Sequence, residues 1–238
     1  MNKDKLNKFI QKYNLGGNIS SVKWSFKNGK LKTNFVTDDK TLLGNVILDN
    51  IDFENCNLGI YSTGQLQKML GVLDDDVKMS LTKFGDKAVS LNVKDNQISF
   101  DYQLADLIAI QDPPSLKKLP DFESKFKIDG NFINIFIKSK NALTDIDSFT
   151  IVNGKDPKCI IGYDKNNTNR ITMPLSVIDN NLSENVVFNA NLFKEVLSAN
   201  KECTSAIFEI SSEGLGRITF NIDDYKCTYY LVATQGVS

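Results

Sequence analysis

The chain contains no histidine among its 238 residues. Histidine is the side chain that most often acts as a general base near neutral pH and as a transition-metal ligand. Its absence excludes serine–histidine and cysteine–histidine nucleophilic sites and lowers the expectation of catalysis. We therefore expect no catalytic residue, no cofactor and no bound metal, although enzymes that use only carboxylates or lysine stay open as a class.

Cysteine and long apolar runs are also scarce. Cys56, Cys159, Cys203 and Cys227 lie far apart and form no C-x-x-C pair, which is typical of free thiols in a reducing compartment. No stretch approaches the ~20 apolar residues of a membrane span. Residues 1–5 run into an amphipathic segment without an apolar signal region, so we expect neither export nor a membrane partner.

The net charge of -1 does not by itself indicate a nucleic-acid partner, but lysines concentrate on four helical segments. These segments hold nine lysines against two acidic residues, a balance of +7 (nine minus two) that leaves -8 for the remainder. Such a cationic layer on an acidic body can attract phosphate. The alternative is that lysines simply favour solvated helix faces. The candidate phosphate-contacting residues are Lys3, Lys5, Lys8, Lys12, Lys68, Lys138, Lys140, Lys194 and Lys201.

Two of these helical segments occur twice, in the same order and at one offset. The apolar stripe Leu6, Phe9, Ile10 after Asn2 recurs 127 positions later as Ile133, Phe136, Ile137 after Asp129. The stripe Leu66, Met69, Leu70 after Ser62 recurs at the same offset as Phe193, Val196, Leu197 after Asn189. Apolar residues at i, i+3 and i+4 indicate a buried helix face, and the preceding polar residue is a candidate N-cap. We interpret the pattern as a duplicated domain.

The segments between the helices predict strands. The runs at 22–26 and 31–36 flank Asn28-Gly29, a hairpin turn pair. Closely spaced turns favour antiparallel pairing. Three prolines in residues 113–120 indicate an extended connector. We therefore predict an α+β fold with domains at 1–111 and 121–238 joined by a connector at 112–120, each domain packing two helices on its sheets. The further strand runs are 42–48, 58–61, 77–81, 88–93, 98–110 with a break, 122–128, 146–152, 159–163, 170–177, 186–188, 206–210, 217–222 and 227–232.

This organisation resembles a DNA polymerase sliding clamp, the two-domain PCNA-like type, and among these the clamps of T4-type bacteriophages. The resemblance covers most of the chain in order, although each motif is short. Its motifs are the lysine-rich opening helix, Asp49-Asn-Ile-Asp-Phe53 before Leu58-Gly-Ile-Tyr61, the helix from Gly64 to Leu73 with Asp74-Asp75 after it, and the closing strand Tyr229-Tyr-Leu-Val-Ala233. The third helix departs from the phage pattern: it is basic through Lys138 and Lys140 and has no arginine, since Arg170 and Arg217 both fall on strand-like runs.

The resemblance implies a homotrimeric ring that encircles double-stranded DNA without sequence preference, with helices lining the hole and the nine lysines facing DNA. It implies a non-enzymatic processivity factor in the cytoplasm of an infected bacterial host. The implied partners are the C-terminal peptide of a replicative polymerase, a clamp loader ATPase and, as candidates, late-transcription factors. The implied pocket for partner peptides holds Leu116, Leu119, Pro120, Tyr230 and Val232.

Two other classes stay open on the sequence. A trimeric phage tail or baseplate β-protein with no DNA-sliding role would explain the sheets and the duplication but not the lysines on the helices. A carboxylate-dependent hydrolase would need a carboxylate pair, and none stands at an interpretable position. The pocket residues, too, can be read as packing at the domain joint.

Overall fold

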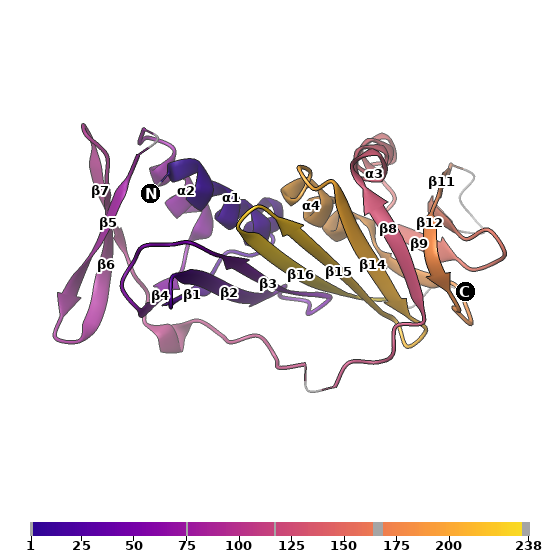
Figure 1. Ribbon diagram of the computed structural model, residues 1–238, viewed down its shortest axis with the longest axis horizontal. Coiled ribbons are helices and arrows are strands. Elements are labelled where there is room, and N and C mark those ends of the chain that lie inside the picture. The colour runs from indigo at the N-terminus through magenta and orange to yellow at the C-terminus, as the bar shows by residue number, and fades with distance from the viewer. Residues whose placement is uncertain (1, 75, 117, 164–168, 235–238) are drawn as a thin grey trace. The chain divides into compact units, whose positions relative to one another are not determined.

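The computed structural model describes residues 2–74, 76–116, 118–163 and 169–234, so Asp75 of the acidic motif and Lys117 of the connector lie outside the described residues. The chain forms two compact units. Unit 1 comprises Met1–Val36, Gly44–Pro114 and Asp223–Lys226, and unit 2 comprises Thr37–Leu43, Ser115–Ile222 and Cys227–Ser238. Helices and antiparallel strands occur in both units, which confirms the predicted α+β class (Figure 1).

Unit 1 begins with a helix and continues in two small antiparallel sheets. The order of strands is β3-β2-β1-β4 in one sheet and β5-β6-β7 in the other. The predicted hairpin is confirmed, because β1 and β2 meet at Asn28 and Gly29, which both have positive φ (53° and 73°). The elements are α1 (Lys3–Asn14), η1 (Leu15–Gly17), β1 (Val22–Lys27), β2 (Lys30–Val36), β3 (Leu42–Leu48), β4 (Cys56–Ile60), α2 (Thr63–Leu70), β5 (Lys78–Phe84), β6 (Lys87–Lys94), β7 (Ser99–Gln103) and η2 (Leu107–Ala109).

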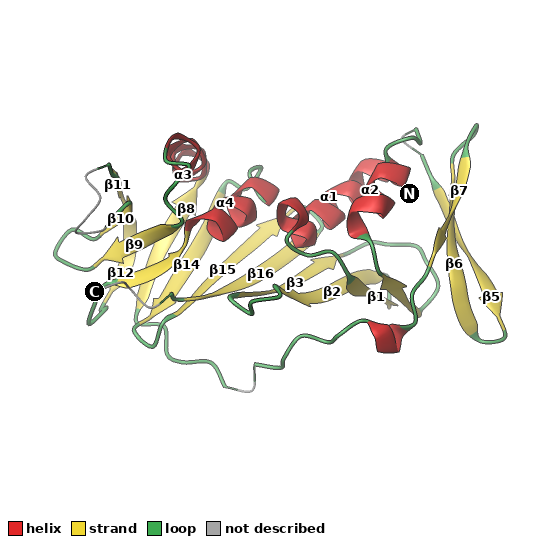
Figure 2. Ribbon diagram, turned by 180° about the vertical axis from the view of Figure 1, so that it is seen from behind, coloured by secondary structure: helices red, strands yellow, loops and turns green. Residues whose placement is uncertain are grey.

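Unit 2 repeats this plan with two antiparallel sheets. Their orders are β12-β8-β14-β15-β16 and β11-β10-β9-β13. In each unit the two helices pack against each other on one side of the strands (Figure 2). The elements are β8 (Ser124–Asp129), α3 (Gly130–Ala142), β9 (Ser148–Val152), β10 (Lys158–Ile161), β11 (Ile171–Pro174), β12 (Ser176–Asn180), β13 (Val186–Asn189), α4 (Ala190–Ala199), β14 (Ser205–Ser211), β15 (Leu215–Ile222) and β16 (Tyr225–Val232).

The 127-residue repeat governs where the elements begin. The starts of α1 and α3, of α2 and α4, and of β5 and β14 are each 127 positions apart, at Lys3 and Gly130, Thr63 and Ala190, and Lys78 and Ser205. The apolar stripes are buried as predicted, except that Met69 and Ile137 are half-exposed. The strand predicted at 170–177 is divided between β11 and β12, and Arg170 precedes β11 rather than lying in it.

Three of the four predicted N-caps are formed. The side-chain oxygens of Asn2, Asp129 and Asn189 accept hydrogen bonds from backbone N–H groups in the first turns of α1, α3 and α4. The prediction is wrong for Ser62, whose side chain makes no cap hydrogen bond to α2. Its backbone instead exchanges hydrogen bonds with the Tyr102 hydroxyl, at 2.9 and 3.2 Å, so β7 fixes the start of this helix.

Each unit has an aromatic core beneath its helices. In unit 1 the ring of Phe9 packs edge-on against Tyr13 and Trp24 at centroid distances of 5.5 and 5.8 Å. In unit 2 the ring of Phe136 packs edge-on against Phe149 and Phe193 at 5.2 and 4.9 Å. Burial of such large rings is the main stabilising contribution and fixes the outward faces of the helices. No helix in the described residues is long and apolar enough to cross a membrane.

Candidate nucleic-acid interface

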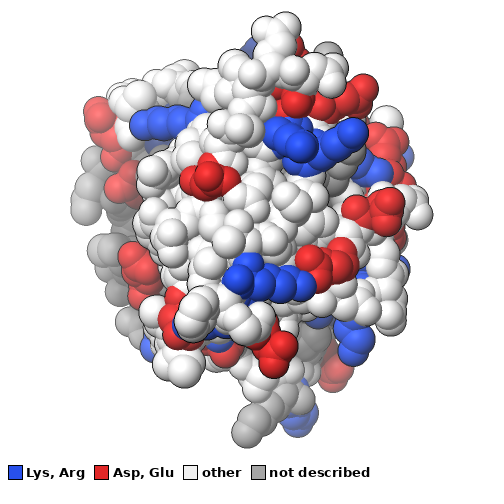
Figure 3. All heavy atoms as spheres, turned by 90° about the vertical axis from the view of Figure 1, so that its left-hand side faces the viewer, with Lys and Arg blue, Asp and Glu red and all other residues white. Residues whose placement is uncertain are grey.

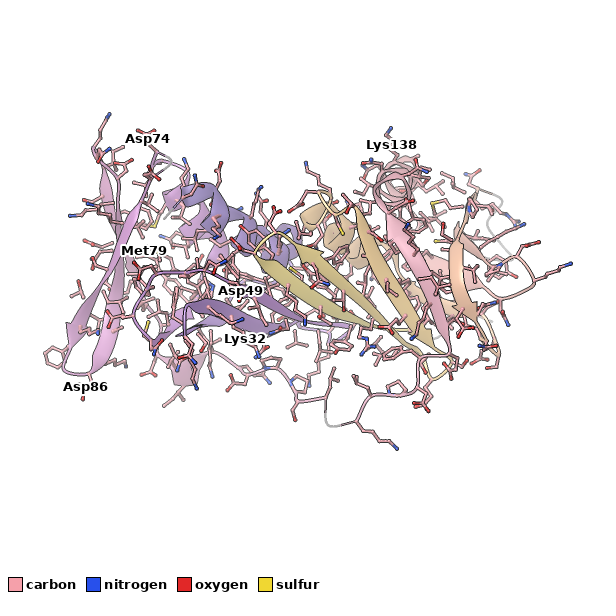
Figure 4. The ribbon with its side chains drawn as sticks, in the orientation of Figure 1. Lys32, Asp49, Asp74, Met79, Asp86 and Lys138 are labelled. Atoms are coloured by element: carbon pink, nitrogen blue, oxygen red, sulfur yellow. The ribbon has the colours of Figure 1, made fainter. Side chains whose placement is uncertain are left out.

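Four of the nine candidate lysines present their charge to solvent. Lys8 on α1, Lys68 on α2, Lys138 on α3 and Lys201 beyond the end of α4 are exposed and form no ion pair with another described residue. Figure 4 shows Lys138 pointing away from the strands, on the outer side of α3. These ammonium groups can contact phosphates without reading bases.

Three further candidates are half-buried and already have protein acceptors. Lys5 pairs with Asp224 at 2.5 Å, and this hydrogen bond, followed by one from Asn50, lowers the pKa of the Asp224 carboxyl. Lys194 pairs with its neighbour Glu195 at 3.1 Å. Lys3 donates a hydrogen bond to the carbonyl of Leu73. A phosphate group would have to compete with these acceptors. Lys3, Lys5 and Lys194 therefore contribute less to a cationic surface than the four exposed lysines do.

The structure corrects the assignment of Lys12 and Lys140, which are buried. The Lys12 ammonium lies over the ring of Tyr225, 5.1 Å from its centroid, so its charge is directed into the protein. The Lys140 ammonium donates hydrogen bonds to the carbonyls of Leu143 and Thr144, both at 3.1 Å, and thereby closes the end of α3. The ammonium groups of Lys12 and Lys140 are therefore not available to contact phosphate.

The repeat itself carried a signal for the burial of Lys140. Position 140 lies 127 residues after Tyr13, which belongs to the buried stripe of α1. For Lys12 no comparable signal exists, because it is covered by Tyr225, a residue 213 positions away (225 minus 12). Lysine spacing alone therefore does not separate an outward face from a covered one.

The residues of the predicted partner pocket differ in exposure. Leu116 is 42% exposed and Val232 is 39% exposed, while Leu119, Pro120 and Tyr230 are half-exposed. Their grouping into one pocket stays a prediction.

Arg217 is the residue of this surface that the sequence reasoning missed. Its guanidinium pairs with Glu209 at 2.6 Å and lies over the ring of Phe122, 4.4 Å from its centroid. The hydrogen bond that Arg217 donates to Glu209 is the largest cause that raises the pKa of Arg217, and the Tyr230 side chain is a smaller one. The ion pair of Arg217 with Glu209 therefore places charged groups on β14 and β15. An alternating strand pattern with Glu209 and Arg217 on neighbouring strands is the signal that could have indicated it.

Two polar hollows lie in unit 1. One, of about 430 Å³, separates β1, β2 and β4 from the first residues of the connector, and Lys23 and Asp112 close it with a 2.7 Å ion pair. The other, of about 600 Å³, includes Asp49, Asp52 and Asp223. No group of three or more potential metal-ligating side chains gathers within the described residues. Neither hollow was predicted from the sequence.

The arrangement of the elements is the sliding-clamp fold. No protein-family model and no curated protein matches the sequence. Among solved structures, the chain is similar to proliferating cellular nuclear antigen from Entamoeba histolytica, with a TM-score of 0.76, 15% identity and coverage of 99% of this chain and 97% of that one. It is also similar to a chain of the PCNA2–PCNA3 complex from Sulfolobus tokodaii, with a TM-score of 0.74, 12% identity and coverage of 98% and 97%. At these identities the likeness defines the fold and leaves the T4-type affiliation an expectation.

Proposed function

We propose that the chain is a non-catalytic sliding clamp, three copies of which close a ring around duplex DNA and tether a replicative polymerase. The observation that carries this proposal is the set of exposed lysines on the helices of a clamp fold, Lys8, Lys68 and Lys138, with Lys201 just beyond the end of α4. Contacts to phosphate that ignore base sequence hold a protein near DNA and still permit it to slide. Processivity would then follow from topology rather than from tight binding.

The ring is supported by the sheets, because unpaired strand edges need partners and symmetric closure supplies them. Light scattering at micromolar concentration should give about 80 kDa, three times the 26.7 kDa of one chain. The trimer should be retained on circular duplex DNA after loading and released when that DNA is cut. If the trimer stays bound equally well after the circular DNA is cut, the structural-protein alternative is favoured. A protein that stays monomeric would contradict the ring.

The DNA-facing surface is tested by charge reversal. Changing Lys8, Lys68 and Lys138 together to Glu should weaken the association with duplex DNA. The slope of log affinity against log salt should fall by about one for each lysine that contacts a phosphate. Surface substitutions typically cost under ~0.5 kcal/mol each, so the variant should remain folded.

The matched control reverses three exposed lysines that lie on strands rather than helices, Lys32, Lys158 and Lys226. It changes the net charge by the same amount and should leave most of the salt slope in place. Equal losses in the two variants would mean that net charge, rather than the helical layer, controls DNA association.

The partner pocket forms part of the same proposal. The side chains of Leu116 and Leu119 are accessible enough to receive the apolar anchor of an extended polymerase peptide. Replacing both by Ser should weaken polymerase binding while the trimer persists. If a polymerase peptide binds the double variant as tightly as the parent, the partner pocket does not include Leu116 and Leu119.

The proposal includes four further expectations from the resemblance. These are the connector at 112–120, the domain limits at 1–111 and 121–238, a clamp loader ATPase as partner and a location in the cytoplasm of an infected bacterium. They gain support only if the ring and the DNA surface behave as described.

A further inference from the structure

Strand β14 of unit 2 is hydrogen-bonded on both edges. It pairs with β15 on one side and, on the other, with β8, which runs antiparallel to it. In this register Asp129 lies opposite Ser205, Ile128 opposite Ala206 and Phe126 opposite Phe208. Because β8 covers it, β14 is an interior strand: Ala206 is 3% and Phe208 1% exposed.

Strand β5 of unit 1 holds the same place in the repeat but is paired on one edge only. Its seven residues begin and end 127 positions before those of β14. Within the described residues β5 pairs with β6, and no strand lies on its other edge. An isolated antiparallel bridge joins Asn2 to Asp76, two residues before β5 begins. The edge that β8 covers in unit 2 is therefore open in unit 1.

The open edge leaves apolar side chains uncovered. Met79 and Leu81, the repeat counterparts of Ala206 and Phe208, are half-exposed, and Phe84 at the end of the strand is 83% exposed. Met79 lies on β5, which is an edge strand of the three-stranded sheet (Figure 4). The face of the molecule that carries β5 to β7 shows a broad uncharged area bordered by basic and acidic groups (Figure 3).

The charges at this edge specify which strand would fit. Lys78 lies directly opposite Lys94 on β6, both are exposed, and neither forms an ion pair with another described residue. Like charges directly opposite each other are unfavourable, so an acidic residue beside Lys78 would be stabilising. β5 has no acidic residue, and its second lysine, Lys83, is paired with Glu54. Two copies of β5 would bring only positive charges together, which disfavours self-pairing.

We propose that the free edge of β5 binds an extended strand of a partner protein by antiparallel β-augmentation. The register of β8 on β14 supplies the pattern: an aromatic residue opposite Leu81, an aliphatic residue opposite Met79 and an acidic residue opposite Lys78. Main-chain hydrogen bonds would supply affinity, and the two apolar positions and the acid would supply specificity. The proposal uses neither the exposed lysines nor the connector residues, and it does not depend on the clamp proposal.

The test uses the full chain and the synthetic peptide Ser-Thr-Phe-Thr-Ile-Asp, the β8 sequence with its two lysines replaced by threonine. The chain has four methionines, so the methyl signals of a ¹³C-methyl-methionine sample report binding locally. The Met79 signal should shift in a saturable way, while that of Met173, buried in unit 2, should not move. Binding should be weak, because ordering a short peptide consumes much of the gain.

Two further comparisons separate edge pairing from unspecific contact. N-methylation of one alternate set of peptide amides should abolish the Met79 shift, and methylation of the other set should preserve it, because only one edge of the added strand pairs. Lys78→Glu should weaken binding about three- to tenfold, and a peptide ending in Lys instead of Asp should recover it. Lys158→Glu, an exposed strand lysine of unit 2, is the matched control and should have no effect.

The proposal is overturned by a Met79 signal that does not move, by equal responses to the two methylated peptides, or by equal effects of Lys78→Glu and Lys158→Glu. Each outcome is independent of DNA binding, so a failure here leaves the clamp proposal unaffected.

Discussion

The two halves of this chain share the positions of their apolar helix stripes and differ in the charge of their exposed helix faces. Phe9 and Phe136 occupy the same repeat position and both are the centre of an aromatic core. By contrast, Lys8 corresponds to the partly exposed Ile135, and Lys68 corresponds to Glu195. The interior of a duplicated fold is constrained by close packing, whereas its outer faces can change independently. Three predictions test how far this comparison extends.

The largest effect is expected from removing the central ring of either core. Phe136→Ala and Phe9→Ala should each cost about 3–5 kcal/mol, because they create cavities among closely packed rings. Trp24 is the one tryptophan of the chain and lies in unit 1, so its fluorescence follows that unit alone, while circular dichroism follows both. Urea unfolding of Phe136→Ala should shift the dichroism transition and leave the Trp24 transition in place.

The control is Phe9→Ala, which should shift the Trp24 transition directly. All samples should be compared at one protein concentration, since assembly changes apparent stability. If Phe136→Ala displaces both signals together, the halves unfold as one cooperative body and the comparison by unit fails.

A medium effect is expected at the repeat position occupied by Tyr13 in one half and Lys140 in the other. Lys140→Met should cost about 2 kcal/mol, because two carbonyls at the end of α3 lose a charged donor. Lys138→Met on the exposed face of the same helix should stay within ~0.5 kcal/mol. Equal urea midpoints for the two variants would show that the buried hydrogen bonds of Lys140 contribute nothing net.

The smallest effect concerns alkaline pH. Burial is the largest cause that raises the pKa of Tyr13 well above its ordinary value, although Thr63 and Trp24 donate hydrogen bonds to its hydroxyl. In the unfolded chain this tyrosine loses its proton near pH ~10, and in the folded chain it stays protonated. The unfolded state then binds fewer protons, so stability falls as pH rises above ~10, by at most ~1.4 kcal/mol per pH unit for this group.

Tyr13→Phe should cost about 1 kcal/mol at neutral pH, where the hydrogen bond from Trp24 is lost. It should also flatten the alkaline decline measured by urea unfolding between pH 9 and pH 11. Part of the decline should persist, because burial also raises the pKa of Tyr229 in unit 2. A decline as steep as that of the parent would exclude Tyr13 as its source.

Much of the fold followed from local patterns in the sequence. The Asn28-Gly29 hairpin and the caps Asn2, Asp129 and Asn189 depend on residues close together in the chain, so local spacing suffices to predict them. The 127-residue repeat was found by comparing the apolar spacing of the two halves. Ser62 was mispredicted because Tyr102, a distant strand residue, holds the start of its helix.

The surface was harder to predict, because exposure depends on elements that pack from elsewhere in the chain. Lys12 is covered by Tyr225, which lies 213 positions further along the chain. A charge on a helix therefore indicates a possible surface, and the tertiary partner decides whether the charge reaches solvent.

The exposed lysines have one more consequence if three chains close into the proposed ring. Each of the exposed lysines has an uncharged or acidic counterpart in the other half of the repeat: Lys8 corresponds to Ile135, Lys68 to Glu195, Lys138 to Gln11 and Lys201 to Asp74. In a ring of three chains the positive potential would therefore repeat once per chain and not once per half-chain. DNA passing through would meet three equivalent positions of favourable potential in each revolution of the ring.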